Sequence, residues 1–353
     1  MPHAMRAKFG ISLSNRAVLF DSATIGDLIT AARTAEESGY FHSVWVGDNL
    51  LSKPRLESIV TLSAIAAHTA TVKLGTICMA SFPLRDPILL AIQWASLDIL
   101  SGGRTILSVC NGASERDGPQ FAHELEVMGV KSNQRVGRVI EGIRILRRLW
   151  SEELVTHQGK YFQFKDVECL PKPVQQPLPI LIAANPKPGQ ADEAAVDRIM
   201  RRVAKYADGW QTDATPVETF RQRFQSIREY AQKEGRDPSQ LESCLHLMVN
   251  INNDRDKAYK EAETFLSSYY GVGAISRDRA ELWLAYGPPE AVIEKIQAYI
   301  DAGCTTPVLR FVSPDLSGQL HRCIEEVLPA FCAQYCPARP KPIAFPRPSG
   351  MWC

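Results

Sequence analysis

The fold is indicated by residues Val72–Arg104, VKLGTICMASFPLRDPILLAIQWASLDILSGGR, which predict one complete strand–loop–helix–turn unit. The first eight residues have the length and β-branched content of a buried strand. The Asp-Pro pair at 86–87 predicts a helix start, because Asp caps free amides and Pro tolerates losing its own. The Gly-Gly pair at 102–103 permits the left-handed turn that ends a helix, and a second strand is predicted over 104–110.

The rest of the chain repeats this alternation of short apolar runs with runs of helical period. The predicted strands are residues 7–13, 43–46, 72–79, 104–110, 179–184, 209–212, 244–250 and 307–312. Eight such units are typical of a (β/α)8 TIM barrel, whereas an open doubly wound sheet would favour a GxGxxG turn, which is absent. We therefore predict one barrel domain over residues 1–336 and an extended, Pro-rich C-terminal tail over 337–353.

Two stretches are too long for ordinary loops, namely 111–132 after the fourth strand and 151–178 before the fifth. Insertions on one rim of a barrel usually shape the mouth of an active site. We expect both insertions at the C-terminal rim, where barrel enzymes carry their chemistry.

Composition excludes several classes of protein. The net charge is +1, and the 353 residues contain no Lys/Arg-rich run, which argues against nucleic acid as a partner. No apolar run approaches the roughly 20 residues of a membrane span, and no leader pattern begins the chain, so we expect a cytoplasmic protein. The nine cysteines include no CxxC pair and no His at ligand spacing, so we predict no metal site and free thiols.

Polar residues follow several predicted strands, where they would face the C-terminal rim. Asp48 could orient a substrate or a ring nitrogen, or it could cap the next turn. The segment 185–189, NPKPG, could hold a phosphate with its amides and its Lys charge, or it could be a polar turn. Residues 115–117 could bind a polar ligand edge or form a solvated charge cluster. His246 could reach a ligand if its face of the strand points inward, or it could be a satisfied core histidine.

A series of motifs resembles the bacterial luciferase-like family, in family order over about Arg6 to Phe331. They are VWVGDN at 44–49, VKLGT at 72–76, LRDPILLA at 84–91, LDILSGGR at 97–104, RVGRVIEGI at 135–143, GKYF at 159–162, PKPVQQPLPI at 171–180 and ADGW at 207–210. The resemblance implies a (β/α)8 barrel that binds FMN or the deazaflavin coenzyme F420. It also implies monooxygenase, reductase or dehydrogenase activity, and a homodimer or homotetramer.

The resemblance implies a cofactor ring in the barrel mouth and phosphate contacts from the loop after the fifth strand. Around Cys78 to Ala80, the family often has a bulge against the ring. The cofactor-binding residues expected on this basis are Thr76, Cys78, Met79, Ala80, Asn111, Ser114, Glu115, Ala184, Asn185, Lys187 and Gly189. Direct roles in catalysis are expected for Asp48, Asn49, Asn111 and His246.

The chain departs from the family pattern at two places. Asn49 stands where many relatives carry His, and an amide cannot transfer a proton near neutral pH as imidazole does. This weakens a dehydrogenase mechanism in which such a His removes a hydroxyl proton. Many relatives also run GxGxG through the fourth strand, where this chain has Ser108, Cys110 and Gly112.

The sequence is therefore interpreted as a flavin-dependent monooxygenase that uses reduced FMN and oxygen on a small organic substrate. A separate flavin reductase is a candidate source of the reduced flavin, because the chain shows no reductase module. Three alternatives stay open: a deazaflavin (coenzyme F420)-dependent reductase or dehydrogenase, a non-catalytic flavin-binding protein, and a metal-dependent barrel hydrolase. The last is disfavoured because no predicted strand end offers an HxH ligand set.

Overall fold

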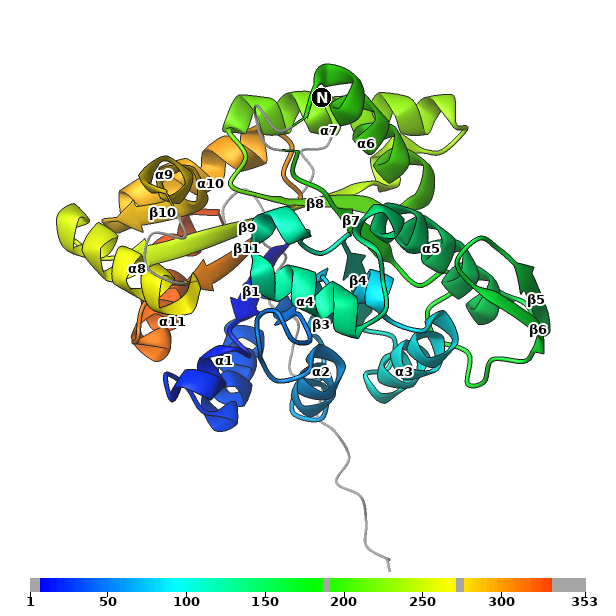
Figure 1. Cartoon of the computed structure of the whole chain (residues 1–353). Coiled ribbons are helices and arrows are strands. Elements are labelled where there is room, and N and C mark those ends of the chain that lie inside the picture. Colours follow the sequence, from blue (N-terminus) through cyan, green and yellow to red (C-terminus); the bar gives the residue numbers. More distant parts are fainter. Residues whose placement is uncertain (1–6, 187–190, 271–275, 332–353) are drawn as a thin grey trace, which may run out of the picture.

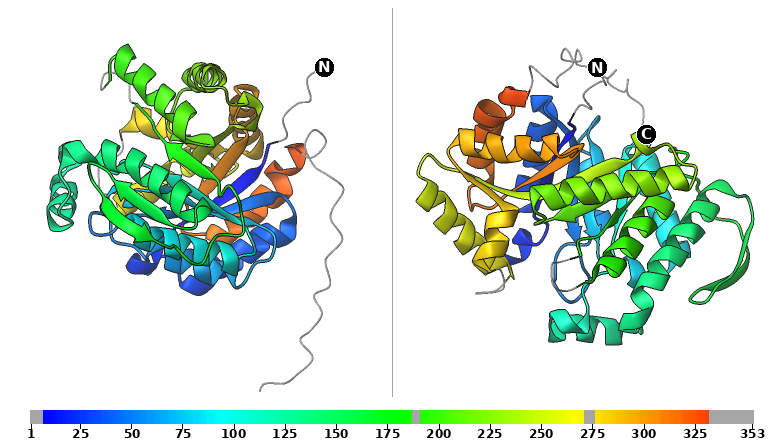
Figure 2. Two further views of the ribbon diagram at one scale, coloured as in Figure 1. Left: turned by 90° about the vertical axis from the view of Figure 1, so that its right-hand side faces the viewer. Right: turned by 90° about the horizontal axis from the view of Figure 1, so that it is seen from above.

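The computed structural model describes residues 7–186, 191–270 and 276–331, and within these ranges eight parallel strands close into a ring surrounded by helices (Figures 1 and 2). In ring order the strands are β1 (Phe9–Leu13), β2 (Phe41–Asp48), β3 (Lys73–Met79), β4 (Thr105–Val109), β7 (Ile180–Ala183), β8 (Gly209–Asp213), β9 (Glu242–Ile251) and β11 (Thr306–Phe311). Pairing of β11 with β1 closes the ring. The predicted (β/α)8 barrel is confirmed.

Most of the helices cover the outside of the ring, whereas α4 (Pro119–Val127) lies in front of the strands in Figure 1. The others are α1 (Ile25–Ser38), α2 (Ser58–Ala66), α3 (Pro87–Leu100), α5 (Arg135–Ser151), α6 (Glu193–Tyr206), α7 (Val217–Lys233), α8 (Arg255–Tyr270), α9 (Arg277–Trp283), α10 (Pro289–Asp301) and α11 (Leu316–Arg322). The predicted start of α3 is confirmed, because Asp86 accepts hydrogen bonds of 2.9 Å from the amides of Ile88 and Leu89. Left-handed Gly102 and Gly103 follow its end, as expected.

The indole of Trp45 on β2 fills the interior of the ring. Trp45 is fully buried, and its Nε1 donates to Ser43 Oγ at 2.8 Å. Its neighbours on β1 and β3 are Gly10 and Gly75, where a Cβ would come within 2.7 and 2.4 Å of the indole. The two glycines therefore make room for the Trp45 indole. The other members of this interior cluster are Ile77, Ile106, Leu181, Cys244 and Val308.

The first predicted insertion lies at the carboxyl ends of the strands, but the second does not line the mouth. Residues 151–178 form a hairpin of β5 (Val155–Gln158) and β6 (Gln163–Val167) that projects beside α5 (Figure 1). The segment that follows the hairpin bonds to the amino end of β4, where Gln175 Nε2 donates to Thr105 O at 2.8 Å. The expected place was wrong because this segment runs from a helix to a strand, and such connections lie at the amino end of a barrel.

The C-terminal third contains a strand that the sequence did not indicate. β10 (Leu284–Gly287) pairs in parallel with the second half of β9, outside the ring of eight. After α11 the chain continues through a π-helical turn, Cys323–Val327, and a last helical turn at 329–331. The tail predicted over 337–353 lies outside the described residues. Within the described ranges, no helix combines the length and apolar content needed to cross a membrane.

Candidate active site

A cavity of about 420 Å³ opens at the carboxyl ends of the strands, in the mouth of the barrel. Residues of six ring strands contribute to its wall, together with residues of α4, α8 and α9. Clefts at this end of a (β/α)8 barrel are where the fold places its chemistry. Representative lining residues are Ser12, Asn49, Cys78, Phe121, His246 and Arg310.

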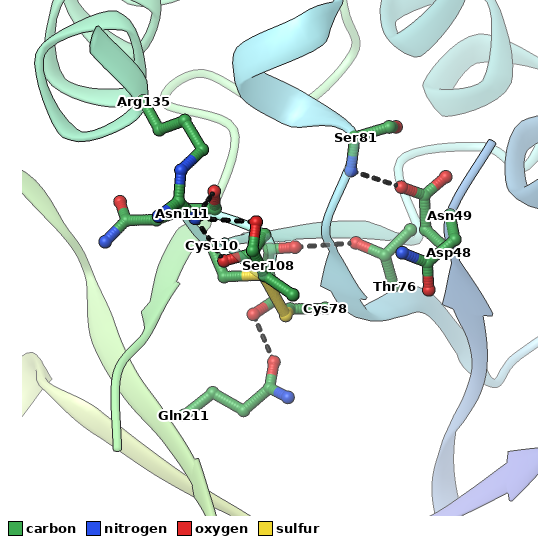
Figure 3. The surroundings of a disulfide bond; sticks show 12 residues. Asp48, Asn49, Thr76, Cys78, Ser81, Ser108, Cys110, Asn111, Arg135 and Gln211 are labelled. Carbon is green, nitrogen blue, oxygen red and sulfur yellow. Dashed lines mark hydrogen bonds between the residues drawn. A yellow bond between two sulfur atoms is a disulfide. The ribbon is translucent and has the colours of Figure 1, made fainter. Parts of the chain in front are cut away.

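Asp48 lines this cavity, but its carboxylate is already engaged by the protein. Oδ1 accepts hydrogen bonds from Ser58 Oγ at 2.8 Å and from Arg85 Nη2 at 3.0 Å. Oδ2 accepts from the backbone amide of Ser81 at 2.8 Å (Figure 3). This geometry joins the end of β2 to α2 and to the loop after β3. The catalytic role expected for Asp48 stays a prediction, and the contacts give it an anchoring role.

Asn49 also lines the cavity and is held by two side chains of the loop after β2. Its Oδ1 accepts from Arg55 Nη2 at 3.1 Å, and its Nδ2 donates to Ser52 Oγ at 3.1 Å. The amide therefore orients Arg55 at the cavity wall. No group at position 49 can take up a proton near neutral pH, as the sequence indicated.

Cys78 and Cys110 form a disulfide between the ends of β3 and β4 (Figure 3). This corrects the expectation of free thiols for this pair, because adjacent parallel strands bring together residues that are 32 positions apart. The peptide bond that precedes Cys78 is cis. Among the described residues, the unpaired cysteines are all buried: Cys169, Cys244, Cys304 and Cys323.

The residues predicted along β3 divide into two groups. Cys78 and Ala80 line the mouth cavity. Thr76 is buried in the wall, where its Oγ1 donates to Ser108 O at 2.9 Å (Figure 3). Met79 is fully buried in the main hydrophobic core. Neither Thr76 nor Met79 lines the mouth cavity or the side pocket, so their cofactor contacts stay predictions.

A side pocket of about 250 Å³ lies across the disulfide from the mouth cavity, since Cys78 lines one and Cys110 the other. Asn111, Ala184 and Asn185 line this side pocket together, so the structure brings three predicted residues to one place. It also contains the half-buried Arg202. Burial lowers the pKa of Arg202 from its ordinary value, although the guanidinium stays charged.

The loop after β4 is fixed by Arg135 of α5. Arg135 Nη1 donates to the carbonyl oxygens of Asn111, Gly112 and Ala113 at 3.0, 2.7 and 2.9 Å (Figure 3). Gly112 has a φ of +66°, and a Cβ there would lie 2.7 Å from Ala80 O. Only glycine therefore fits this close approach of the loop to the tip of β3.

Ser114 and Glu115 line neither the mouth cavity nor the side pocket. Ser114 caps a short 3-10 turn, and its Oγ donates to Asp117 Oδ2 at 2.8 Å. Glu115 is exposed, and a hydrogen bond from Ser132 lowers the pKa of its carboxyl. Their cofactor contacts stay predictions. Lys187 and Gly189, predicted in the phosphate-binding loop, lie outside the described residues.

His246 faces the mouth cavity, so the inward-facing alternative holds. Its Nε2 is buried without a hydrogen-bond partner among the described residues. Burial and the nearby Arg310 charge lower the pKa of His246 to about 3, so the imidazole is neutral near pH 7. An unsatisfied ring nitrogen in a cavity can bond to a ligand. The imidazole and the Trp283 indole form a T-shaped contact, with ring centroids 5.9 Å apart.

Sequence reasoning missed the basic residues of the mouth, which are Lys53, Arg55, Arg279 and Arg310. Arg310 was detectable, because it is a charged residue within the apolar run 307–312 and is only 6% exposed. Buried arginines are rare unless they serve a partner or a ligand. Nothing in the sequence indicated that Tyr269 and Tyr270, at the end of α8, belong to the site. Aromatic residues on an amphipathic helix usually pack in the core.

These features define a (β/α)8 barrel with one cavity in its mouth and a polar side pocket across the disulfide. The model of the luciferase-like monooxygenase family matches residues 5–306, so the chain belongs to this family and is an enzyme of oxidoreductase type. No group of three or more His, Cys, Asp or Glu side chains placed to hold a metal ion occurs in the part of the chain that the structure describes.

Three similar proteins show the range of this family. An F420-dependent glucose-6-phosphate dehydrogenase from Kineococcus radiotolerans is 26% identical over 328 residues, covering 86% of this chain and 92% of the relative. The solved structure of an F420-dependent secondary alcohol dehydrogenase, bound to an F420–acetone adduct, matches with a TM-score of 0.76 and 21% identity over 93% and 99% of the two chains. A monooxygenase from Streptomyces bottropensis matches with a TM-score of 0.72 and 24% identity over 92% and 99%.

Proposed function

We propose that this protein is a deazaflavin (coenzyme F420)-dependent oxidoreductase that acts on a small organic substrate. The observation that carries the proposal is the near-full-length similarity to F420-dependent dehydrogenases, at 26% identity over 86% of the chain. A second F420-dependent relative, a hydroxymycolic acid dehydrogenase from Mycobacterium tuberculosis, is 28% identical over 82% of the chain. These relatives support the deazaflavin alternative over the FMN monooxygenase expected first from the sequence.

The shape and the donor set of the mouth fit a flat heterocycle with an anionic side chain. The cavity of about 420 Å³ offers the unpartnered Nε2 of His246 and the amide of Asn49 as polar contacts. The side pocket offers Asn111 and the Arg202 guanidinium, which suits the phosphate-bearing end of such a cofactor. Gly112 keeps the loop that separates the two spaces close to β3.

When bound, the deazaflavin would supply or accept a hydride. The protein must then move one proton to or from the substrate. Burial and the neighbouring Arg55 charge lower the pKa of Lys53 to about 8, so its ammonium can exchange a proton near neutral pH. The charges of Arg310 and Arg55 lower the pKa of Tyr269 despite its burial. His246 remains neutral and orients a ligand by hydrogen bonding.

Titration of the purified protein with F420 and with FMN, in oxidised and reduced forms, tests this proposal. Intrinsic fluorescence reports binding, and an oxygen electrode reports turnover with oxygen. We expect micromolar affinity for F420, with no oxygen uptake above that of the free cofactor. Oxygen uptake with reduced FMN would support the monooxygenase reading instead, and binding of neither cofactor would refute both.

A flavin monooxygenase remains the second candidate. Asn49 cannot serve as the proton acceptor that alcohol oxidation requires, whereas oxygen activation by a reduced flavin needs mainly a dry pocket. The fold shared with the monooxygenase from Streptomyces bottropensis is compatible with this activity. In that case a separate flavin reductase would supply the reduced cofactor, and adding such a reductase with a nicotinamide donor would start oxygen uptake.

We further propose that the protein forms a homodimer through α2 and α3. Val60, Leu89 and Leu100 on these helices expose 69%, 56% and 71% of their surface. Exposed apolar residues on two packed helices are typical of a subunit interface. Light scattering during gel filtration should give twice the mass of 39.2 kDa, and Leu89→Glu should shift the mass to that of one chain.

A further inference from the structure

Four basic residues gather on one side of the mouth, and they come from three separate segments. Arg16 follows β1, Lys53 and Arg55 follow β2, and Arg310 lies on β11. Lys53, Arg55 and Arg310 line the mouth cavity, and Arg16 contacts the same Tyr269 ring as Arg310. We call these four residues the cationic cluster.

The cationic cluster is neutralised by no carboxylate among the described residues. None of its members forms an ion pair with another residue in the described ranges. Arg55 donates to Lys53 O and to Asn49 Oδ1, both at 3.1 Å, and Arg310 Nη2 donates to Ser14 Oγ at 3.1 Å. These acceptors are uncharged, and Arg310 also bonds to the side chains of Tyr269 and Tyr270, of which Tyr269, with a pKa of about 7, balances part of the charge. The Nε atoms of Arg16 and Arg310 are buried without any acceptor in the described part of the chain.

The carboxylates that face the cavity are committed to other partners. Asp48 is held by Arg85, and Asp213 pairs with Arg279 at 3.1 Å while accepting from Asn185. Asp117 is exposed and accepts hydrogen bonds from the amide and hydroxyl of Ser114. The acidic residues of the mouth therefore leave the charge of the cationic cluster in place.

Aromatic rings are the main neighbours of the cluster. The Arg310 guanidinium lies 4.1 Å from the Tyr269 ring centroid, and the Lys53 ammonium lies 4.8 Å from that of Tyr270. Cation–π contacts offset only part of the cost of removing charges from water. Mutual repulsion is also evident, because burial and Arg55 lower the pKa of Lys53 to about 8. A bound anion would relieve both costs.

We propose that the substrate carries an anionic group of the phosphate, sulfonate or carboxylate type, and that Lys53, Arg55 and Arg310 bind this group in the mouth. This inference rests on the proposed function, because it assigns the substrate of the same cavity. Guanidinium groups pair with two oxygens of such an anion, and Lys53 adds a point charge. The anionic end of the cofactor has a separate basic site, since Arg202 lies in the side pocket beyond the disulfide.

Binding of inorganic phosphate to the cofactor-free protein tests the assignment. Calorimetry measures anion binding, and thermal denaturation measures the unfolding temperature, as phosphate replaces sodium chloride at constant ionic strength. Methanesulfonate and acetate are tested in the same way. We expect saturable binding by at least one of the three anions and a higher unfolding temperature. Equal unfolding temperatures in all of these salts would overturn the proposal.

The matched variants are Lys53→Met and Lys165→Met. Lys165 lies on the β5–β6 hairpin with a side chain 78% exposed, far from the mouth. We expect Lys53→Met to bind the anion about ten-fold more weakly, and Lys165→Met to bind it unchanged. Equal affinity of Lys53→Met and the parent protein would show that the cluster is not the binding site. Arg55→Met repeats the test should Lys53→Met fail to fold.

A competition experiment separates this inference from the proposed function. F420 is titrated into the protein with and without the bound anion. Independent binding of both ligands supports the substrate assignment. Competition between them would assign the cluster to the phosphate of the cofactor instead and overturn the inference. Anion binding without any F420 binding would refute the proposed function and leave the anion site intact.

Discussion

The carboxylate of Asp48 and the guanidinium of Arg85 form a buried ion pair, with Oδ1 3.0 Å from Nη2 and side chains 0% and 12% exposed. Arg85 also pairs with Glu57 at 2.7 Å. The pair joins β2 to the loop after β3 and so fixes the distance between two walls of the mouth. Removing the Asp48 charge would cost the protein its charged hydrogen bonds to Arg85 and Ser81, although Arg85 would keep its pairing with Glu57.

Asp48→Asn should therefore lower the free energy of unfolding by about 1.5–3 kcal/mol, the range for lost hydrogen bonds to a charged group. Urea denaturation followed by circular dichroism measures this change. The control is Glu37→Gln, which breaks an exposed pair with Arg33 and should cost less than about 1 kcal/mol. An Asp48→Asn protein of unchanged stability but without turnover would instead establish a chemical role for this carboxylate.

His246 should make the protein sensitive to acid. Its pKa is about 3 in the folded state and near 6.5 when unfolded, so the unfolded state binds the extra proton between these values. Stability is fully present above pH 6.5 and falls as the pH decreases, by at most about 5 kcal/mol from this group. Urea denaturation at a series of pH values measures the free energy of unfolding, which should depend less on pH for His246→Gln than for the parent protein. The same dependence on pH in both proteins would contradict the burial of a neutral imidazole.

The Cys78–Cys110 disulfide should stabilise the barrel mouth by restricting the unfolded chain. For a separation of 32 residues the chain-entropy model gives about 3–4 kcal/mol. A reducing agent should therefore lower the unfolding temperature of the parent protein, which calorimetry measures. The same agent should have no effect on the double variant Cys78→Ser/Cys110→Ser, because its remaining described cysteines are unpaired. A reductant effect that persists in the double variant would contradict the assignment.

Tyr269 should ionise at a lower pH than an ordinary tyrosine. Burial opposes this, but the charges of Arg310 and Arg55 dominate and lower its pKa. The ultraviolet absorbance of tyrosinate, followed against pH, should contain one early component that is missing from Tyr269→Phe. Tyr299 gives the contrast, because burial raises its pKa to about 12. Persistence of the early component in Tyr269→Phe would assign it to another residue.

The architecture could be predicted because it depends on local patterns. Strand and helix periods alternate through the chain, and Asp86 and Gly102 mark the two ends of α3 as their chemistry requires. β10 could not be predicted, since a four-residue strand beside the second half of β9 has too little pattern of its own. The segment 151–178 was recognised as an insertion, but it was assigned to the wrong end of the barrel. It follows a helix and precedes a strand, and such connections lie at the amino end.

The residues of the site that lie at strand ends could be predicted, and those that reach it from helices and loops could not. Residues at strand ends, such as Asn49, Asn111 and His246, were found because topology alone carries them to the mouth. Residues whose position depends on three-dimensional packing were missed. Tyr269 reaches the mouth from a helix, and Lys53 does so from an irregular loop. The disulfide depends on the alignment of β3 with β4, which no local pattern encodes.

The Trp45 indole, wedged against Gly10 and Gly75, makes the barrel a blind-ended chamber. A ligand therefore enters and leaves the described barrel at its carboxyl end, so a substitution that narrows this opening should slow the exchange of ligands with solvent.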